Sequence, residues 1–141
     1  MKIFFGDIVH TWNSKAMWTS PLNIGYISSY ANKKLKEDGI NIEFKLFKNP
    51  QLMLDAIRDE KPDIVALSHY VWNAKINKKI FDFTKSLHPN CLNVGGGPQF
   101  TLHNYNEEEA TKFFKKNINC DFYILNQGEK GFYQLSKNFY L

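Results

Sequence analysis

Short apolar runs alternate with longer stretches of helical periodicity along the chain. The apolar runs, each of which predicts a strand, lie at residues 2–9, 40–47, 64–67, 91–94 and 120–125. Ile27, Ala31 and Leu35 recur every four residues, which predicts a helix from Ser20-Pro21 to Gly39. Further helices are predicted from Asn49-Pro50 to residue 60, from 74 to 87, from about Asn106, and over the final residues.

Five strands that are each followed by a helix favour parallel pairing with right-handed crossovers. The run at residues 64–67 is apolar throughout and predicts a central strand, whereas Ile42, Phe44 and Leu46 alternate with polar residues and predict a strand near a sheet edge. We therefore expect one α/β domain over residues 1–141. It should be a three-layer, doubly wound, parallel five-stranded sheet of the flavodoxin-like type, with strand order 2-1-3-4-5.

Composition narrows the possible functions. The chain has 141 residues, 43% of them hydrophobic, and a formal net charge of +4. Arg58 is the only arginine among 18 basic residues, so we do not expect nucleic-acid binding. No apolar stretch approaches a membrane span and no targeting signal is visible, so we expect a cytoplasmic protein without membrane contact. The two cysteines, Cys91 and Cys120, exclude a disulfide scaffold, a zinc ribbon or an iron–sulfur site within this chain.

In a doubly wound sheet, ligands bind beyond the carboxyl ends of the strands at the topological switch. The loops expected there lie at residues 10–20, 68–73, 95–105 and 126–131, and they contain Trp12, Trp18 and Trp72, all the tryptophans of the chain. They also contain three of its four histidines. Such loops suit a large, flat and partly apolar ligand.

Gly95-Gly96-Gly97 is the sharpest single feature of the sequence. Consecutive glycines allow a ligand to approach the backbone, or they satisfy a loop that needs positive φ, and both interpretations stay open. Ser68 can direct its hydroxyl into the crevice or cap a turn. His69 is better explained as a packed or solvated histidine than as a metal ligand. Glu129 suits the start of a helix whether or not it contacts a ligand.

Several common chemistries have no counterpart in the sequence. No Ser-His-Asp arrangement, paired carboxylates or Gly-x-Ser-x-Gly motif is present, and we assign no metal ligand and no catalytic residue. The triple glycine matches neither a P-loop nor the dinucleotide fingerprint. A phosphorelay receiver domain needs an aspartate where the third strand ends, and Ser68 occupies that position.

The order and spacing of several short motifs resemble the cobalamin (B12)-binding domain found at the N-terminus of radical S-adenosylmethionine (SAM) enzymes. The motifs that carry the resemblance are Pro21-Leu22-x-x-x-Tyr26-Ile27, Lys61-Pro62-Asp63-Ile64-Val65-Ala66-Leu67-Ser68, Asn93-Val94-Gly95-Gly96-Gly97-Pro98, Asp121 and Gly128-Glu129-x-x-Phe132-x-x-Leu135. The resemblance implies that the corrin lies over the carboxyl end of the sheet and that its nucleotide tail enters the crevice. Ser68 would then approach the dimethylbenzimidazole base. The residues expected to bind cobalamin are Trp12, Ser68, His69, Tyr70, Gly95, Gly96, Gly97, Pro98, Gln127, Gly128 and Glu129.

Two motifs of related enzymes are missing. The Asp-x-His-x-x-Gly motif that supplies a histidine ligand to cobalt does not occur at Asp7–Trp12, so we expect cobalamin to bind base-off without such a ligand. The Cys-x-x-x-Cys-x-x-Cys motif is also absent, so this chain is not catalytic alone. The 4Fe-4S cluster and SAM would belong to a downstream domain.

The sequence therefore predicts a cobalamin-binding module of, or partner to, a B12-dependent radical SAM enzyme, such as a methyltransferase. In that role it would position the corrin for methyl transfer or a radical step. Two alternatives stay open. One is a degenerate flavodoxin-like interaction domain without a cofactor, and the other is an FMN-binding module.

Overall fold

A computed structural model describes residues 1–9, 20–99 and 105–141 of the chain. In these residues strands and helices alternate in the order β1 (Lys2–Gly6), α1 (Leu22–Glu37), β2 (Glu43–Phe47), α2 (Pro50–Glu60), β3 (Ile64–Ser68), α3 (Ala74–Leu87), β4 (Leu92–Gly96), α4 (Glu107–Lys116), β5 (Phe122–Ile124) and α5 (Gly128–Tyr140). This alternation confirms the α/β class expected from the sequence.

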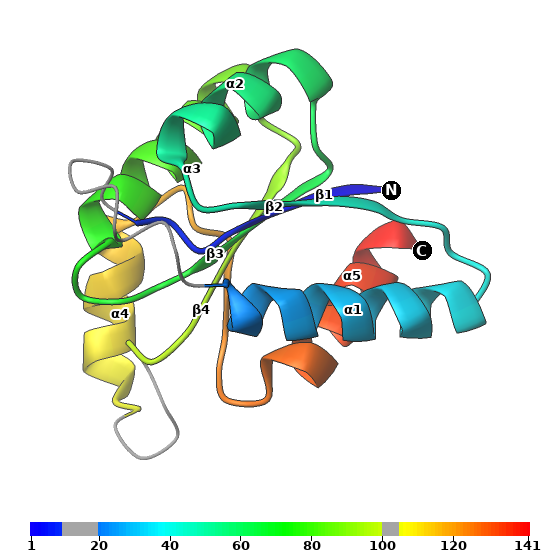
Figure 1. Cartoon of the computed structure of the whole chain (residues 1–141). Helices are drawn as coiled ribbons and strands as arrows, with labels where there is room; N and C mark the ends of the chain where they lie inside the picture. Colours follow the sequence, from blue (N-terminus) through cyan, green and yellow to red (C-terminus); the bar gives the residue numbers. More distant parts are fainter. Residues whose placement is uncertain (10–19, 100–104) are drawn as a thin grey trace.

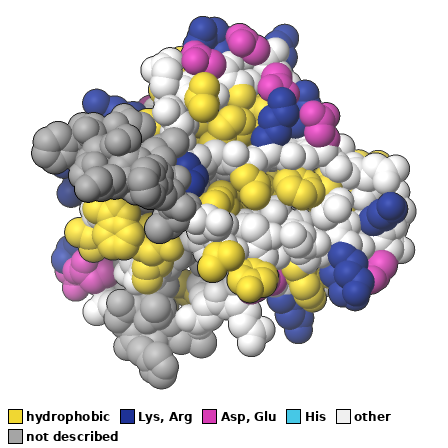
Figure 2. All heavy atoms as spheres, in the orientation of Figure 1, with side chains coloured by type: hydrophobic (Ala, Val, Ile, Leu, Met, Phe, Trp, Pro, Cys, Tyr) yellow, Lys and Arg dark blue, Asp and Glu magenta, His cyan; other side chains and the backbone are white. Residues whose placement is uncertain are grey.

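The strands form one parallel sheet in the order β2-β1-β3-β4-β5, as predicted. All five residues of β3 are buried, which agrees with its uninterrupted apolar sequence. The strand β2 lies at the sheet edge, where Leu46 is 41% exposed. Figure 2 shows hydrophobic side chains in a row between α1 and this edge.

Helices cover both faces of the sheet, so the molecule has three layers (Figure 1). The helices α1 and α5 pack on one face, over Ile3, Phe5 and Ala66. The helices α2 and α3 pack on the other face, over Phe4 and Val65, where α4 contributes Phe113. Since successive strand residues point to opposite faces, neighbouring positions enter different cores.

The helix boundaries follow local signals in the sequence. The side chain of Asn49 accepts hydrogen bonds from the backbone N–H groups of Gln51 and Leu52, and Asn106 caps α4 in the same way. Gly39, just past the end of α1, has φ of +79°. The predicted cap at Ser20 is wrong in detail, because α1 begins at Leu22 and has no capping side chain.

Three strands are shorter than the sequence predicts, one of them being the predicted run at residues 120–125, of which only Phe122–Ile124 form β5. Beyond Gly6 the chain continues next to β2, with Asp7 N–H donating to Phe47 O (2.9 Å) and Val9 N–H to Lys48 O (3.1 Å), but it no longer pairs with β3. The predicted strand at residues 40–47 begins only at Glu43. The apolar residues before it instead belong to the core under α1, where Ile40 is buried.

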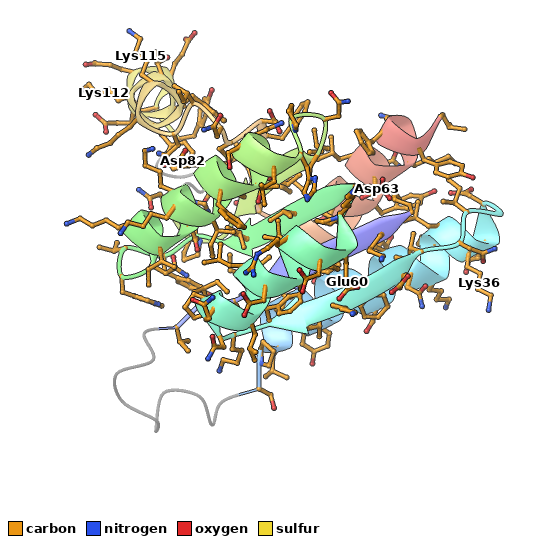
Figure 3. All side chains as sticks on the ribbon, turned by 90° about the horizontal axis from the view of Figure 1, so that it is seen from above. Lys36, Glu60, Asp63, Asp82, Lys112 and Lys115 are labelled. Atoms are coloured by element: carbon orange, nitrogen blue, oxygen red, sulfur yellow. The ribbon has the colours of Figure 1, made fainter. Side chains whose placement is uncertain are left out.

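The helix α4 stands at the side of the molecule. Only Phe113 of this helix is buried, and the labelled Lys112 and Lys115 point away from the other elements (Figure 3). Among the described helices, none is both long and apolar enough to cross a membrane.

Candidate functional site

A cleft of about 290 Å³ opens at the carboxyl end of the sheet, on the face covered by α1 and α5. Its floor is apolar and contains Phe5 of β1, Ala66 of β3 and Val94 of β4. One wall comes from the first turns of α1, and the other comes from the start of α5. The cleft thus lies where the two halves of a doubly wound sheet diverge, which is the usual ligand position in this architecture.

Eight of the residues expected to bind a ligand line this cleft. They are Ser68, Tyr70, Gly95, Gly96, Gly97, Pro98, Gly128 and Glu129. They come from the ends of β3 and β4, from the segments after them and from the start of α5. Glu129 is the only charged side chain among the described residues of the lining.

Three expected residues are not part of this cleft. Trp12 lies outside the described residues. Gln127 is exposed at the N-cap position of α5 and is not in the lining. His69 is fully buried on the opposite face of the sheet, because it follows Ser68 directly and strand alternation turns it away.

The three consecutive glycines have different structural reasons. Gly97 has φ of +123°, and a Cβ there would lie 2.7 Å from the backbone oxygen of His69. A Cβ at Gly95 would lie 2.9 Å from the ring of Tyr123. The fold itself therefore accounts for these two glycines. A Cβ at Gly96 would meet no described atom closer than Ile124 O at 3.5 Å, so packing among the described residues does not require glycine at this position.

A small polar cluster lies beside the apolar floor. The amide nitrogen of Asn23 donates to the Ser68 hydroxyl (2.8 Å) and to the Tyr70 hydroxyl (3.0 Å). Asp7 lies next to this cluster, and burial raises the pKa of its carboxyl, although Lys48 and Asn23 oppose the shift. Burial, followed by the charge of Asp7, raises the pKa of Tyr70. Both effects keep the Tyr70 phenol protonated at neutral pH.

Two buried asparagines fix the segment between β3 and α3. The Asn73 amide donates to the carbonyls of Ile8 (3.2 Å) and Ser68 (3.0 Å), and its oxygen accepts from the Tyr70 N–H (2.9 Å). Asn77 donates to the same Ser68 carbonyl at 2.9 Å. These bonds satisfy backbone groups that burial would otherwise leave unpaired, and they hold Ser68 and Tyr70 in place.

His69 occupies a dry aromatic cage on the other face. Its ring stacks on Phe81 (centroids 5.8 Å apart) and meets Phe113 and Tyr123 edge-on. Neither ring nitrogen has a hydrogen-bond partner among the described residues. Burial lowers the pKa of His69 to about 4, and the Leu67 backbone offsets only part of this effect. The sequence interpretation of His69 as a packed histidine is therefore correct.

Two residues of the cleft come from a helix and were not expected from the sequence. They are Asn23 and Tyr26, in the first turns of α1. Tyr26 belongs to the motif quoted for the resemblance, so it had a usable signal. Asn23 had none, because one asparagine near the start of a helix is an ordinary surface pattern.

The described residues offer little independent chemistry. They contain no group of three or more His, Cys, Asp or Glu side chains that could hold a metal ion. Cys91 and Cys120 precede β4 and β5, at the opposite end of the sheet from the cleft, and burial raises the pKa of each thiol to about 12. At neutral pH these cysteines are protonated and unreactive.

Comparison with known proteins gives two relevant relatives. The chain is 28% identical over 120 residues (82% of its length) to the cobalamin-dependent radical SAM methyltransferase TokK of Streptomyces tokunonensis. It is 30% identical over 94 residues (63% of its length) to the 2-(S-pantetheinyl)-carbapenam-3-carboxylate methyltransferase of Streptantibioticus cattleyicolor. The resemblance to the B12-binding domain of radical SAM enzymes is confirmed. No family model matches the chain.

The matched segments are short parts of these two relatives. The chain spans 16% of the length of TokK and 13% of the length of the carbapenam methyltransferase. Most of each relative therefore has no counterpart in the 141 residues of this chain.

Solved structures show the same fold. A cobalamin-binding protein from Desulfitobacterium hafniense aligns with 98% of the chain and 58% of its own length, with a TM-score of 0.60 and 14% identity. The receiver domain of NtrC4 from Aquifex aeolicus aligns with 99% of the chain and 95% of its own length, with a TM-score of 0.58 and 15% identity. At these identities the likeness concerns the fold alone, and a B12-binding domain and a receiver domain share it.

Proposed function

We propose that this chain binds cobalamin and acts as the cofactor-holding module of a B12-dependent radical SAM methyltransferase. The observation that carries the proposal is Gly96. It lines the cleft at the end of β4, where a Cβ would have only ordinary contacts with the described residues. A guest that packs against the backbone at this point explains the glycine.

The residues of the cleft fit one part of the cofactor. A volume of about 290 Å³ is far too small for a whole cobalamin, but it suits a flat base at the end of a nucleotide tail. The apolar floor of Phe5, Ala66 and Val94 matches an aromatic base, and the Ser68 hydroxyl matches its ring nitrogen. The corrin would then lie outside the cleft, over the carboxyl end of the sheet.

The cofactor would supply the transfer of a methyl group through its cobalt, and the chain would supply binding and orientation. The apolar floor excludes water from the inserted base. Ser68 offers a hydrogen bond, and Asn73 holds the β3–α3 segment in place by donating to the Ser68 carbonyl. A site that is already ordered loses little entropy when the ligand binds.

The radical step needs groups that this chain does not contain. A 4Fe-4S cluster and SAM would come from a radical SAM domain, either in the same polypeptide or in a partner. The lengths of the two relatives support this division, because the chain matches only a sixth or less of each. The methyl acceptor would be bound there as well.

Titration with hydroxocobalamin tests the proposal. We expect the wild-type chain to shift the corrin absorption spectrum, and the Gly96→Leu variant to lose binding because its side chain fills the cleft. Gly25→Leu is the matched control. It makes the same change on α1, where a Cβ would have nothing within 4 Å, and it should bind like wild type.

The same titration separates the alternatives. Quenching of FMN fluorescence without a change in the corrin spectrum would support the flavin-binding hypothesis. A wild-type chain that binds neither compound at high excess would contradict the proposal and leave an interaction domain. Equal binding by wild type and Gly96→Leu would place the cofactor elsewhere on the chain.

A further inference from the structure

The orientation of the Asn23 side-chain amide is determined by its neighbours. Its oxygen lies 2.7 Å from the backbone nitrogen of Ile24. Because a backbone N–H can only donate, the atom facing it must be the amide oxygen. The amide nitrogen therefore faces the hydroxyls of Ser68 and Tyr70, at 2.8 and 3.0 Å.

This orientation determines the role of the Ser68 hydroxyl. The Asn23 amide nitrogen has no lone pair to offer, so the Ser68 oxygen must accept in their hydrogen bond. No described residue accepts the hydroxyl proton of Ser68. Ser68 is 7% exposed and lines the cleft, so this proton is left for a guest.

We infer that Asn23 is a positioning residue that makes Ser68 a hydrogen-bond donor toward the cleft. The site thereby selects a guest with an unprotonated acceptor, such as the ring nitrogen of the base in the cobalamin tail. This inference rests on the proposed function. Asn23 itself has no bond to spare for the guest, since its amide nitrogen faces the hydroxyls of Ser68 and Tyr70 and the carboxyl of Asp7, and its oxygen accepts from the Ile24 N–H.

The variant Asn23→Asp reverses this arrangement with almost no change in shape. Asp7, whose pKa burial already raises, takes up a proton when a second carboxyl stands beside it, so the new carboxylate still accepts from the Ile24 N–H and also accepts from the hydroxyls of Ser68 and Tyr70. Ser68 would then present lone pairs to the cleft, where they repel a ring nitrogen. Asn32→Asp is the matched control, because it makes the same charge change on the same helix at a position outside the cleft lining.

Two corrinoids distinguish the positioning role from a general structural one. Cobinamide ends before the nucleotide base, whereas hydroxocobalamin carries it. We expect Asn23→Asp and Ser68→Ala each to weaken hydroxocobalamin binding by about tenfold or more, because a buried polar contact is lost or reversed. Cobinamide affinity should stay within about twofold of wild type in both variants.

A double variant completes the test. If Asn23 acts through Ser68, Asn23→Asp combined with Ser68→Ala should bind hydroxocobalamin no more weakly than Ser68→Ala alone. Additive losses would overturn the inference, as would equal weakening of both corrinoids or no effect of Asn23→Asp. If one of these three results is found but the wild-type chain binds hydroxocobalamin, the inference about Asn23 is wrong and the proposed function still holds. A wild-type chain that binds neither corrinoid overturns both.

Discussion

The two faces of the sheet differ sharply where β3 and β4 end, although the same few residues build both. On the α1 side, Ser68 and Gly96 line a cleft with partly open space and a hydrogen-bonded polar cluster. On the α3 side, His69 is packed among three aromatic rings, and its ring nitrogens have no partner among the described residues. One face keeps open space beside polar groups, and the other is filled by described side chains.

This difference shows how one residue step along a strand separates the lining of a cleft from a core. Ser68 and His69 are adjacent in sequence and both are polar, but alternation sends one to each face. The same holds for Gly95 and Gly96. A motif that spans such positions in sequence therefore mixes residues that contact the guest with residues that support the fold. The following predictions test this separation, from the largest expected effect to the smallest.

Gly97→Ala should lower the stability of the folded chain more than the other substitutions. A side chain there combines φ of +123° with a Cβ placed 2.7 Å from His69 O, so the β4 end must move away from β3. We expect a loss of more than about 3 kcal/mol in the free energy of unfolding, measured by urea denaturation. A variant that unfolds at the same urea concentration as wild type would show that the turn does not need glycine.

His69 should make stability depend on pH. Its pKa is about 4 in the folded chain and near 6.5 when unfolded, so the unfolded state binds the extra proton between these values. The His69 contribution to the free energy of unfolding is therefore fully present above pH 6.5. It falls by roughly 3 kcal/mol as the pH drops from 6.5 to 4. Urea denaturation at a series of pH values measures this slope.

The His69→Leu variant isolates this contribution. The raised pKa of Asp7 acts in the opposite direction, since its protonated form is favoured by folding, and it is present in both chains. The free energy of unfolding of wild type, measured relative to that of His69→Leu, should therefore fall only between pH 6.5 and 4. Parallel stability curves over that range would mean that His69 is not held neutral by its cage.

The fold was largely predictable because its signals are local and repeated. The apolar run that became β3 and the alternation at Phe44 and Leu46 placed a central and an edge strand correctly, and Asn49 and Asn106 cap helices as expected. The end of β1 was not predictable. Residues beyond Gly6 keep bonds to β2 but leave β3, which depends on the path of another segment.

The candidate site was predictable only as a set of loops. Sequence position could place Ser68 and the three glycines at the carboxyl end of the sheet, and alternation separates neighbouring residues, but neither could say which face of the sheet would carry the cleft. Asn23 reaches Ser68 across 45 positions of sequence, and only the packing of α1 against the sheet brings them together. The Asn73 network has the same origin, because its acceptor Ile8 O lies 65 positions away.

Gly95→Ala and Gly96→Ala are expected to have the smallest effects on stability. They compare the two faces of the sheet directly, because the two residues are neighbours on β4. A Cβ at Gly95 lies 2.9 Å from the Tyr123 ring and 3.2 Å from the His69 ring, so those side chains must shift, at a cost of about 1–2 kcal/mol in unfolding free energy. At Gly96 the Cβ has ordinary contacts, and the same change should be neutral or should stabilise the chain by up to about 1 kcal/mol. Thermal unfolding of both variants measures the difference. If Gly96→Ala proved the more damaging of the two, the cleft face would also be packed by the chain, and the structural reason for a guest at Gly96 would disappear.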